Sequence, residues 1–140
     1  MTFMIGGDGD EVAVMMPAFH AMGRDIHHLG VFGSGMACKV VNNFLAVSSV
    51  VAVRKAMVSA ERFGLNSQTL LNIARSSSGI TWYGDNIARI SWATEGYDSE
   101  NTIGILEKDL LFFLDAIDDE PGDFESALFM EIRRMEPLQP

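Results

Sequence analysis

The sequence predicts a mainly α-helical protein: an all-helical C-terminal domain around one long buried helix, preceded by a βαβ piece that ends an α/β domain. Residues 2–29 show a short strand, a helix and a second short strand in succession. An apolar segment over 36–63 follows, far too long for a strand. The remaining chain has helical periodicity interrupted by Gly, Ser and Asp. We therefore expect residues 1–30 to end one domain and residues 31–140 to form a second.

The βαβ piece begins with a strand from Thr2 to Ile5, followed by a glycine- and aspartate-rich loop over 6–10. A helix over 11–22 contains Pro17, which predicts a kink or a late start. The second strand covers 26–29. So short a strand–helix–strand succession predicts a parallel pair of strands with a right-handed crossover.

The helical part begins with the segment over 36–63, for which Gly64 supplies a C-terminal stop. Because this segment is apolar on most sides, we expect it to be central in the fold. Further helices are predicted over 67–74 with Ser67 as N-cap, over 82–93, over 102–117 with Thr102 as N-cap, and over 124–135.

Composition narrows the classes of function. The chain has 140 residues and a formal net charge of −9, which argues against nucleic acid or an anionic membrane as the main partner. The single cysteine, Cys38, allows no internal disulfide and favours a cytoplasmic location. The N-terminus lacks a signal-peptide pattern. The apolar stretch over 44–53 is expected to be too short and too polar to span a membrane.

A glycine turn, Gly33-Ser34-Gly35, leads into the long helix and is followed by one cation and two amides. These are Lys39, Asn42 and Asn43, spaced three and four residues apart, so that they share one helical face. Polar groups gathered at the start of an apolar helix are suited to binding and polarising an oxygen atom of a substrate. A lysine there can also stabilise a developing alkoxide and relay its proton.

The chain resembles the C-terminal part of the β-hydroxyacid dehydrogenases, the family of 3-hydroxyisobutyrate and tartronate-semialdehyde reductases. The glycine turn with its lysine and asparagines matches the family signature G-x-G-x-x-x-K-x-x-N-N. Three further passages carry the resemblance: the last Rossmann strand and turn over 2–8, the serine- and glycine-rich loop before a tryptophan over 76–82, and the K-D-L motif over 108–110.

The resemblance implies reversible oxidation of a small β-hydroxyacid with NAD or NADP, catalysed by Lys39. Gly33, Ser34, Gly35, Asn42 and Asn43 would contact the substrate, and Lys108 would contact the cofactor. The cofactor carries the hydride chemistry, and the protein supplies position and charge. The resemblance also implies a Rossmann domain, a long linking helix and a helical domain that often forms dimers.

The sequence departs from the family in two places. It contains no G-x-G-x-x-G loop, so we expect NAD or NADP to bind in a full-length parent and not to this chain alone. The segment over 116–125 is shorter than in relatives, as in a trimmed helical domain or a partial gene product.

Simpler interpretations exist for several of these residues. Lys39 is also compatible with a surface lysine near a helix start, and Lys108 with an ordinary surface ion pair to Glu107 or Asp109. The loop over 6–10 lacks phosphate-loop spacing. The three histidines His20, His27 and His28 lack neighbouring ligands at metal-binding spacing, so no metal is expected.

Two functions follow. In the first, the chain is the substrate-binding and dimerisation part of a β-hydroxyacid dehydrogenase, inactive without a Rossmann domain. In the second, it is a non-catalytic helical dimerisation module derived from that family. A two-stranded sheet with open edges and a long apolar helix both need additional cover, so we expect at least a homodimer, with helices exchanged between chains as one way to form it.

Overall fold

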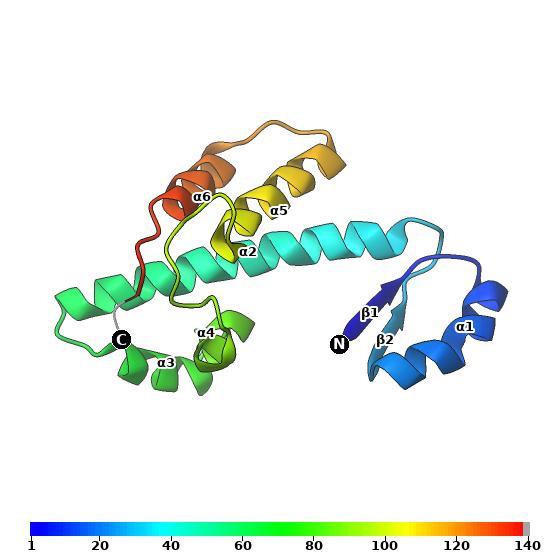
Figure 1. The fold of residues 1–140 in the computed structure, drawn as a ribbon, viewed down its shortest axis with the longest axis horizontal. Coiled ribbons are helices and arrows are strands. Elements are labelled where there is room, and N and C mark those ends of the chain that lie inside the picture. Colours follow the sequence, from blue (N-terminus) through cyan, green and yellow to red (C-terminus); the bar gives the residue numbers. More distant parts are fainter. Residues whose placement is uncertain (139–140) are drawn as a thin grey trace. The chain divides into compact units, whose positions relative to one another are not determined.

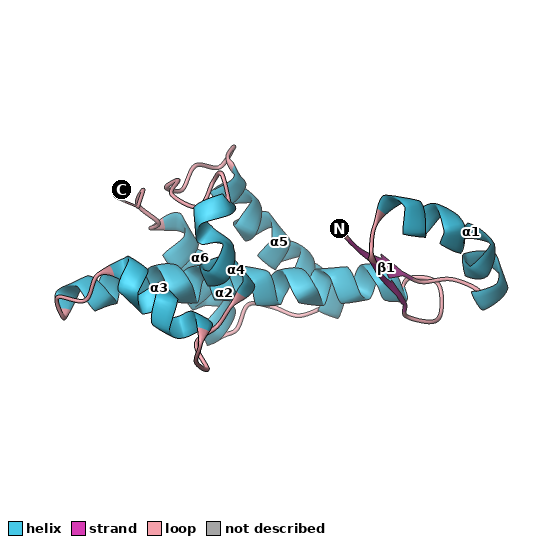
Figure 2. Cartoon of the chain, turned by 90° about the horizontal axis from the view of Figure 1, so that it is seen from below, coloured by secondary structure: helices cyan, strands magenta, loops and turns pink. Residues whose placement is uncertain are grey.

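The computed structural model describes residues 1–138 and confirms a mainly helical chain with two short strands (Figures 1 and 2). The chain forms two compact units, residues 1–42 and the residues from Asn43 onward. Helix α2, Ser34–Arg62, belongs to both, because its start packs with the βαβ piece. The domain boundary near residue 30 stays a prediction.

The first unit contains β1 (Thr2–Ile5), α1 (Gly9–Met22) and β2 (Asp25–His28). The strands are parallel as predicted, with Thr2 opposite Asp25 and Ile5 opposite His28. Figure 1 shows α1 beside the two strands, and the rings of Phe3 in β1 and Phe19 in α1 lie 5.4 Å apart. These contacts partly cover a sheet that is too small to be stable alone, in which Phe3, Met4, Ile5 and Ile26 are half-buried.

The start of α1 differs from the prediction. The Asp8 carboxylate accepts hydrogen bonds from the backbone N–H groups of Asp10 and Glu11, at 2.9 and 3.3 Å. This N-cap moves the helix start to Gly9, inside the segment expected to be a loop. The helix continues through Pro17 to Met22.

The long helix α2 agrees with the prediction and is followed by Gly64 in a left-handed conformation, φ +71°. Its buried valines Val47, Val50 and Val51 lie on one face and join the core. On other faces, Leu45 is 62% exposed. The helix is therefore central to the second unit along one stripe only.

The second unit adds α3 (Ser67–Arg75), α4 (Trp82–Asn86), the 3₁₀ turn η1 (Ile87–Arg89), α5 (Thr102–Ile117) and α6 (Asp123–Arg133). Figure 1 shows α5 and α6 lying side by side along α2. Buried side chains from several of these segments meet the valines of α2 in one core: Tyr83, Ala93, Ile103, Leu106, Leu110, Leu128 and Ile132.

Three details of the predicted helices are wrong, each for a local reason. Asn66, not Ser67, caps α3, because its side-chain oxygen Oδ1 accepts hydrogen bonds from the backbone N–H groups of Gln68 and Thr69. Asn101, not Thr102, caps α5 in the same way. The helix predicted over 82–93 ends at Asn86 and tightens into a 3₁₀ turn, and the chain then turns so that Ala93 is fully buried.

The short connection between α5 and α6 agrees with the sequence. Asp118 takes a left-handed conformation, φ 53°, and ends α5. The Glu125 carboxylate accepts from the N–H of Gly122 at 3.1 Å and fixes the start of α6. The two helices are thus antiparallel neighbours, as a link of this length requires.

Within residues 1–138, α2 is the one helix that is long and apolar enough to cross a membrane on length and composition alone. The sequence predicts that the apolar stretch over 44–53 is too short to span a membrane. That prediction applies to this stretch and not to the whole of α2, which is long enough. Core helices of soluble proteins meet the same criterion, and α2 carries Arg54 within its buried face.

Candidate functional site

Lys39 and Asn42 lie together at a recess in the first unit. The recess has a volume of about 470 Å³ and is lined by residues of β1 and the start of α2: Thr2, Phe3, Met4, Gly35, Met36, Lys39 and Asn42. Both polar side chains are exposed, so the recess opens to solvent. An ammonium and an amide on one helix, three residues apart, therefore border the same recess.

Glycines bring the start of α2 against the end of β1. A methyl group on Gly6 would lie 2.6 Å from the carbonyl oxygen of Val31 and 2.7 Å from Oγ of Ser34. A methyl group on Gly35 would overlap the carbonyl oxygen of Met4. Gly33 has φ +91°, a conformation that glycine adopts without strain. The turn therefore holds Lys39 next to β1 through backbone contacts that larger residues would prevent.

The glycine turn contributes unequally to the recess. Gly35 lines it, whereas Gly33 and Ser34 are not among the lining residues. The Oγ atom of Ser34 is buried and has no hydrogen-bond partner among the described residues. Ser34 thus packs into the contact with Gly6. Its expected contact with a substrate stays a prediction.

Asn43 follows Asn42 on α2 and is half-buried, in contrast to the exposed Asn42. It is the first residue of the second unit and does not line the recess. The sequence placed both asparagines at the site; the structure brings Asn42 to Lys39 at the recess and leaves the role of Asn43 as a prediction.

Lys108 belongs to the second unit, on α5, with its ammonium 5.5 Å from the centroid of the Phe112 ring. The ion pair with Glu107, one of the simpler interpretations, does not form. The Glu107 carboxylate instead accepts hydrogen bonds from the Arg133 guanidinium and, at 2.8 Å, from the Tyr97 hydroxyl. The hydrogen bonds from Arg133 are the main reason why the pKa of Glu107 is lowered. Lys108 therefore lies exposed on α5, beside the Phe112 ring and without an ion pair to Glu107.

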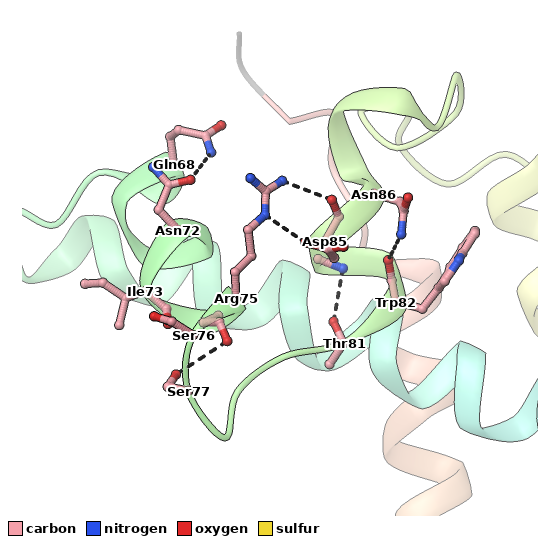
Figure 3. A network of polar contacts seen from close by, with 12 residues as sticks. Gln68, Asn72, Ile73, Arg75, Ser76, Ser77, Thr81, Trp82, Asp85 and Asn86 are labelled. Atoms are coloured by element: carbon pink, nitrogen blue, oxygen red, sulfur yellow. Dashed lines mark hydrogen bonds and ion pairs between the residues drawn. The ribbon is translucent and has the colours of Figure 1, made fainter.

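The loop resembling the family's serine/glycine passage is anchored by an ion pair at its base. Nε of Arg75 lies 2.9 Å from the Asp85 carboxylate, and Nη2 donates to the Asp85 carbonyl at 3.0 Å (Figure 3). The two aromatic residues that follow this loop, Trp82 and Tyr83, differ in burial. Tyr83 is 1% exposed, whereas Trp82 is 69% exposed.

Sequence reasoning missed Arg54, which the structure makes prominent. The side chain is 4% exposed, and its guanidinium donates to three carbonyls, those of Ala93 at 3.0 Å, Glu95 at 2.8 Å and Glu136 at 2.6 Å. The Tyr83 hydroxyl donates to the same Ala93 carbonyl at 3.0 Å. Burial raises the pKa of Tyr83, and the nearby Arg54 charge partly opposes this effect. The sequence signal that could have identified Arg54 is its position as a charged residue within a mostly apolar helical segment.

A second recess, of about 350 Å³, lies beside Arg54 in the second unit. Its lining includes the ion pair of Lys55 and Glu131, whose Nζ and Oε1 atoms are 3.0 Å apart.

Within residues 1–138, no group of three or more His, Cys, Asp or Glu side chains is placed to hold a metal ion. His28 instead hydrogen-bonds through Nε2 to the carbonyl of Gly7 at 2.9 Å.

The sequence over residues 33–126 matches the protein family described as NAD-binding of NADP-dependent 3-hydroxyisobutyrate dehydrogenase. The chain belongs to this family. The match includes the glycine turn, Lys39, both asparagines and Lys108, so the resemblance drawn from these motifs is confirmed at the level of the family.

Curated members of the 3-hydroxyisobutyrate dehydrogenase family are similar over part of their length. An NAD-dependent L-serine dehydrogenase of Pseudomonas aeruginosa is 40% identical over 59% of this chain and 28% of its own length. The mitochondrial 3-hydroxyisobutyrate dehydrogenase of Homo sapiens is 34% identical over 72% of this chain and 30% of its own length. The alignments thus span less than a third of these relatives.

Solved structures share the fold. A 3-hydroxyisobutyrate dehydrogenase of Mycobacterium tuberculosis, solved with L-serine, has a TM-score of 0.70 and 23% identity, covering 96% of this chain and 52% of its own. A 3-hydroxyisobutyrate dehydrogenase of Salmonella typhimurium has a TM-score of 0.74 and 20% identity, covering 94% of this chain and 47% of its own. The chain therefore corresponds to about half of the fold in each.

Proposed function

We propose that this chain is the substrate-binding part of an NAD(P)-dependent β-hydroxyacid dehydrogenase, with Lys39 as its catalytic residue. The observation that carries the proposal is the recess where Lys39 and Asn42 meet Gly35 and β1. An ammonium and an amide at one opening match the needs of a hydroxyl or carbonyl oxygen whose charge changes during reaction.

The chemistry assigned to Lys39 is proton transfer and charge stabilisation. During oxidation, its neutral amine accepts the proton of the substrate hydroxyl as the adjacent carbon loses a hydride. During reduction, its ammonium donates a proton to the carbonyl oxygen that becomes a hydroxyl. The Asn42 amide, on the same side of α2, orients that oxygen by a hydrogen bond. NAD or NADP, when bound, supplies the hydride acceptor or donor.

The residues present fit one part of a cofactor site. Lys108 offers an exposed positive charge on α5 to anionic oxygens. The sequence contains no glycine-rich G-x-G-x-x-G loop. We therefore propose that turnover requires a Rossmann domain, supplied in a longer parent chain or by a second polypeptide, and that the substrate is a small β-hydroxyacid.

Turnover of a panel of β-hydroxyacids with NAD and with NADP tests the proposal. The chain is assayed alone and after mixing with the separately produced nucleotide-binding part of a full-length relative. We expect activity only in the mixture, and a loss of about 100-fold or more for Lys39→Met, the usual contribution of a proton-transferring group. Lys55→Met, which changes an exposed lysine of the same helix, is the matched control.

Two results would count against the proposal. Equal turnover by the wild type and by Lys39→Met would remove Lys39 from catalysis. A mixture with no turnover, together with a stable dimer of the chain, would favour the second candidate, a non-catalytic helical dimerisation module. The exposed apolar side chains of α2, such as Leu45, are the observation that supports that candidate.

A further inference from the structure

Phe112 lies one turn after Lys108 on α5 and places an aromatic face under its ammonium. The distance from Nζ of Lys108 to the ring centroid is 5.5 Å, within the range of a cation–π contact. The spacing of four residues puts both side chains on one helical face. Phe112 is 52% exposed, so the pair lies at the surface and not in the core.

Glu107, the acidic residue directly before Lys108, does not pair with the Lys108 ammonium in place of this ring. Both oxygens of the Glu107 carboxylate are occupied, one by Arg133 and one by Tyr97. Among the residues that the structure describes, the Phe112 ring is the partner of the Lys108 ammonium. An aromatic ring attracts the ammonium without neutralising it, so the positive charge stays available to an anion.

We propose that Phe112 is a positioning residue that holds the Lys108 ammonium on α5 for contact with the anionic oxygens of a nicotinamide dinucleotide. The inference rests on the proposed function, since it assigns a second residue to the cofactor contact of Lys108. A leucine at position 112 would preserve the helix and its apolar surface but would remove the attraction. At an exposed site, that attraction changes an equilibrium constant by about two- to five-fold.

The small number of lysines permits a direct test. The chain contains three, Lys39, Lys55 and Lys108. Reductive ¹³C-dimethylation keeps their charge and gives each side chain its own NMR signal, assigned by single Lys→Arg variants. The Lys108 signal is compared in the wild type, Phe112→Leu and Phe112→Trp, without ligand and during separate titrations with NADH and NADPH. Because we expect the cofactor to need a Rossmann domain, each titration contains the separately produced nucleotide-binding part of a full-length relative, left unmethylated so that only the lysines of this chain give signals.

We expect the Lys108 signal to show an aromatic ring-current shift in the wild type and in Phe112→Trp, and to lose it in Phe112→Leu. With NADH or NADPH, the apparent affinity reported by this signal falls about two- to five-fold in Phe112→Leu and is retained in Phe112→Trp. Leu111→Ala removes an equally exposed apolar side chain without a ring and leaves both readouts unchanged.

The positioning role is overturned by any of three results: a Lys108 signal that is the same in the wild type and in Phe112→Leu, equal titrations of the two proteins, or no response of Lys108 to either cofactor in the wild type. The catalytic role of Lys39 is judged separately by turnover of the Lys39→Met variant. Either assignment can therefore fail while the other stands.

Discussion

The guanidinium of Arg54 joins α2 to two segments that are distant in sequence. Its hydrogen bonds to the carbonyls of Ala93, Glu95 and Glu136 fix the turn after η1 and the chain after α6. Buried carbonyls need donors, and one arginine provides a planar set of them. A positive charge in the buried face of α2 is therefore structural in this protein, whereas Lys39 on the same helix is exposed.

Arg54→Met is expected to lower the free energy of unfolding by about 3 kcal/mol, because three carbonyls lose a charged donor while the apolar stem is kept. Arg54→Lys should lose nearly as much, since one ammonium lacks the planar fork that meets all three oxygens. Urea unfolding followed by circular dichroism measures both variants. Arg89→Met, which changes an exposed arginine, is the control. A value for Arg54→Met within about 0.5 kcal/mol of this control would contradict a structural role.

The carboxylate of Glu107 makes stability depend on pH. Hydrogen bonds from Arg133 lower its pKa in the folded protein below the ordinary value of 4.5. Its stabilising contribution is therefore fully present above pH 4.5 and is lost as the pH falls through the lowered folded pKa. We expect Glu107→Gln to melt below the wild type at pH 6–7 and the difference to shrink progressively as the pH falls below 4.5. Thermal unfolding between about pH 3 and pH 7 measures this difference, with Glu100→Gln, a change of an exposed carboxylate, as the control. A difference independent of pH would refute the assignment.

At the scale of elements, side-chain caps and glycine contacts decide where helices begin and end. Asp8, Asn66 and Asn101 each cap a helix. A side-chain oxygen of each accepts hydrogen bonds from backbone N–H groups two or three residues later in the chain. The periodicity of apolar residues predicts that these helices exist. The choice between adjacent polar residues as the cap depends on backbone geometry that periodicity does not contain.

Gly6→Ala tests the contact between the end of β1 and the start of α2. Its added methyl group would lie 2.6 Å from a backbone oxygen, so the start of α2 must move away. We expect faster amide hydrogen exchange in β1 and β2 and a changed NMR signal of the Lys39 side chain. Gly9→Ala is the matched control, because the nearest atom to its methyl group, in His28, is 3.9 Å away. Equal exchange in the two variants would show that the close contact is unimportant.

At the scale of the whole molecule, much apolar surface is left exposed. The α2 side chains Met36, Val41, Leu45 and Val58 are 70%, 47%, 62% and 47% exposed. Exposed apolar side chains on one long helix support the proposal that the chain associates with itself. The expected homodimer, with or without exchanged helices, remains a proposal.

Light scattering tests this proposal. We expect the wild type to have at least the mass of a dimer. Leu45→Glu should lower the measured mass toward that of the monomer, because a charge at an apolar interface is costly to bury. Val14→Glu places the same charge at a 78% exposed valine of α1 and serves as the control. A wild type that is monomeric at all concentrations would exclude self-association as the cover for α2.

The order of the elements, the parallel strands, the long helix and the family could all be predicted from the sequence. These features follow from local periodicity, glycine and turn chemistry, and a motif confined to eleven consecutive residues, Gly33 to Asn43. The sequence also grouped Lys39 with Asn42 and Asn43, because residues three and four apart share a helical face.

Which polar groups meet across the chain could not be predicted from the sequence and is visible in the folded protein alone. Arg54 reaches carbonyls 39, 41 and 82 residues away, Glu107 pairs with Arg133 and not with Lys108, and Tyr83 is buried while the adjacent Trp82 is exposed. Such pairings depend on how helices pack, and packing depends on all the contacting residues together. The unequal roles of Gly33, Ser34 and Gly35 at the recess arise for the same reason, because only the folded backbone shows which of them faces β1.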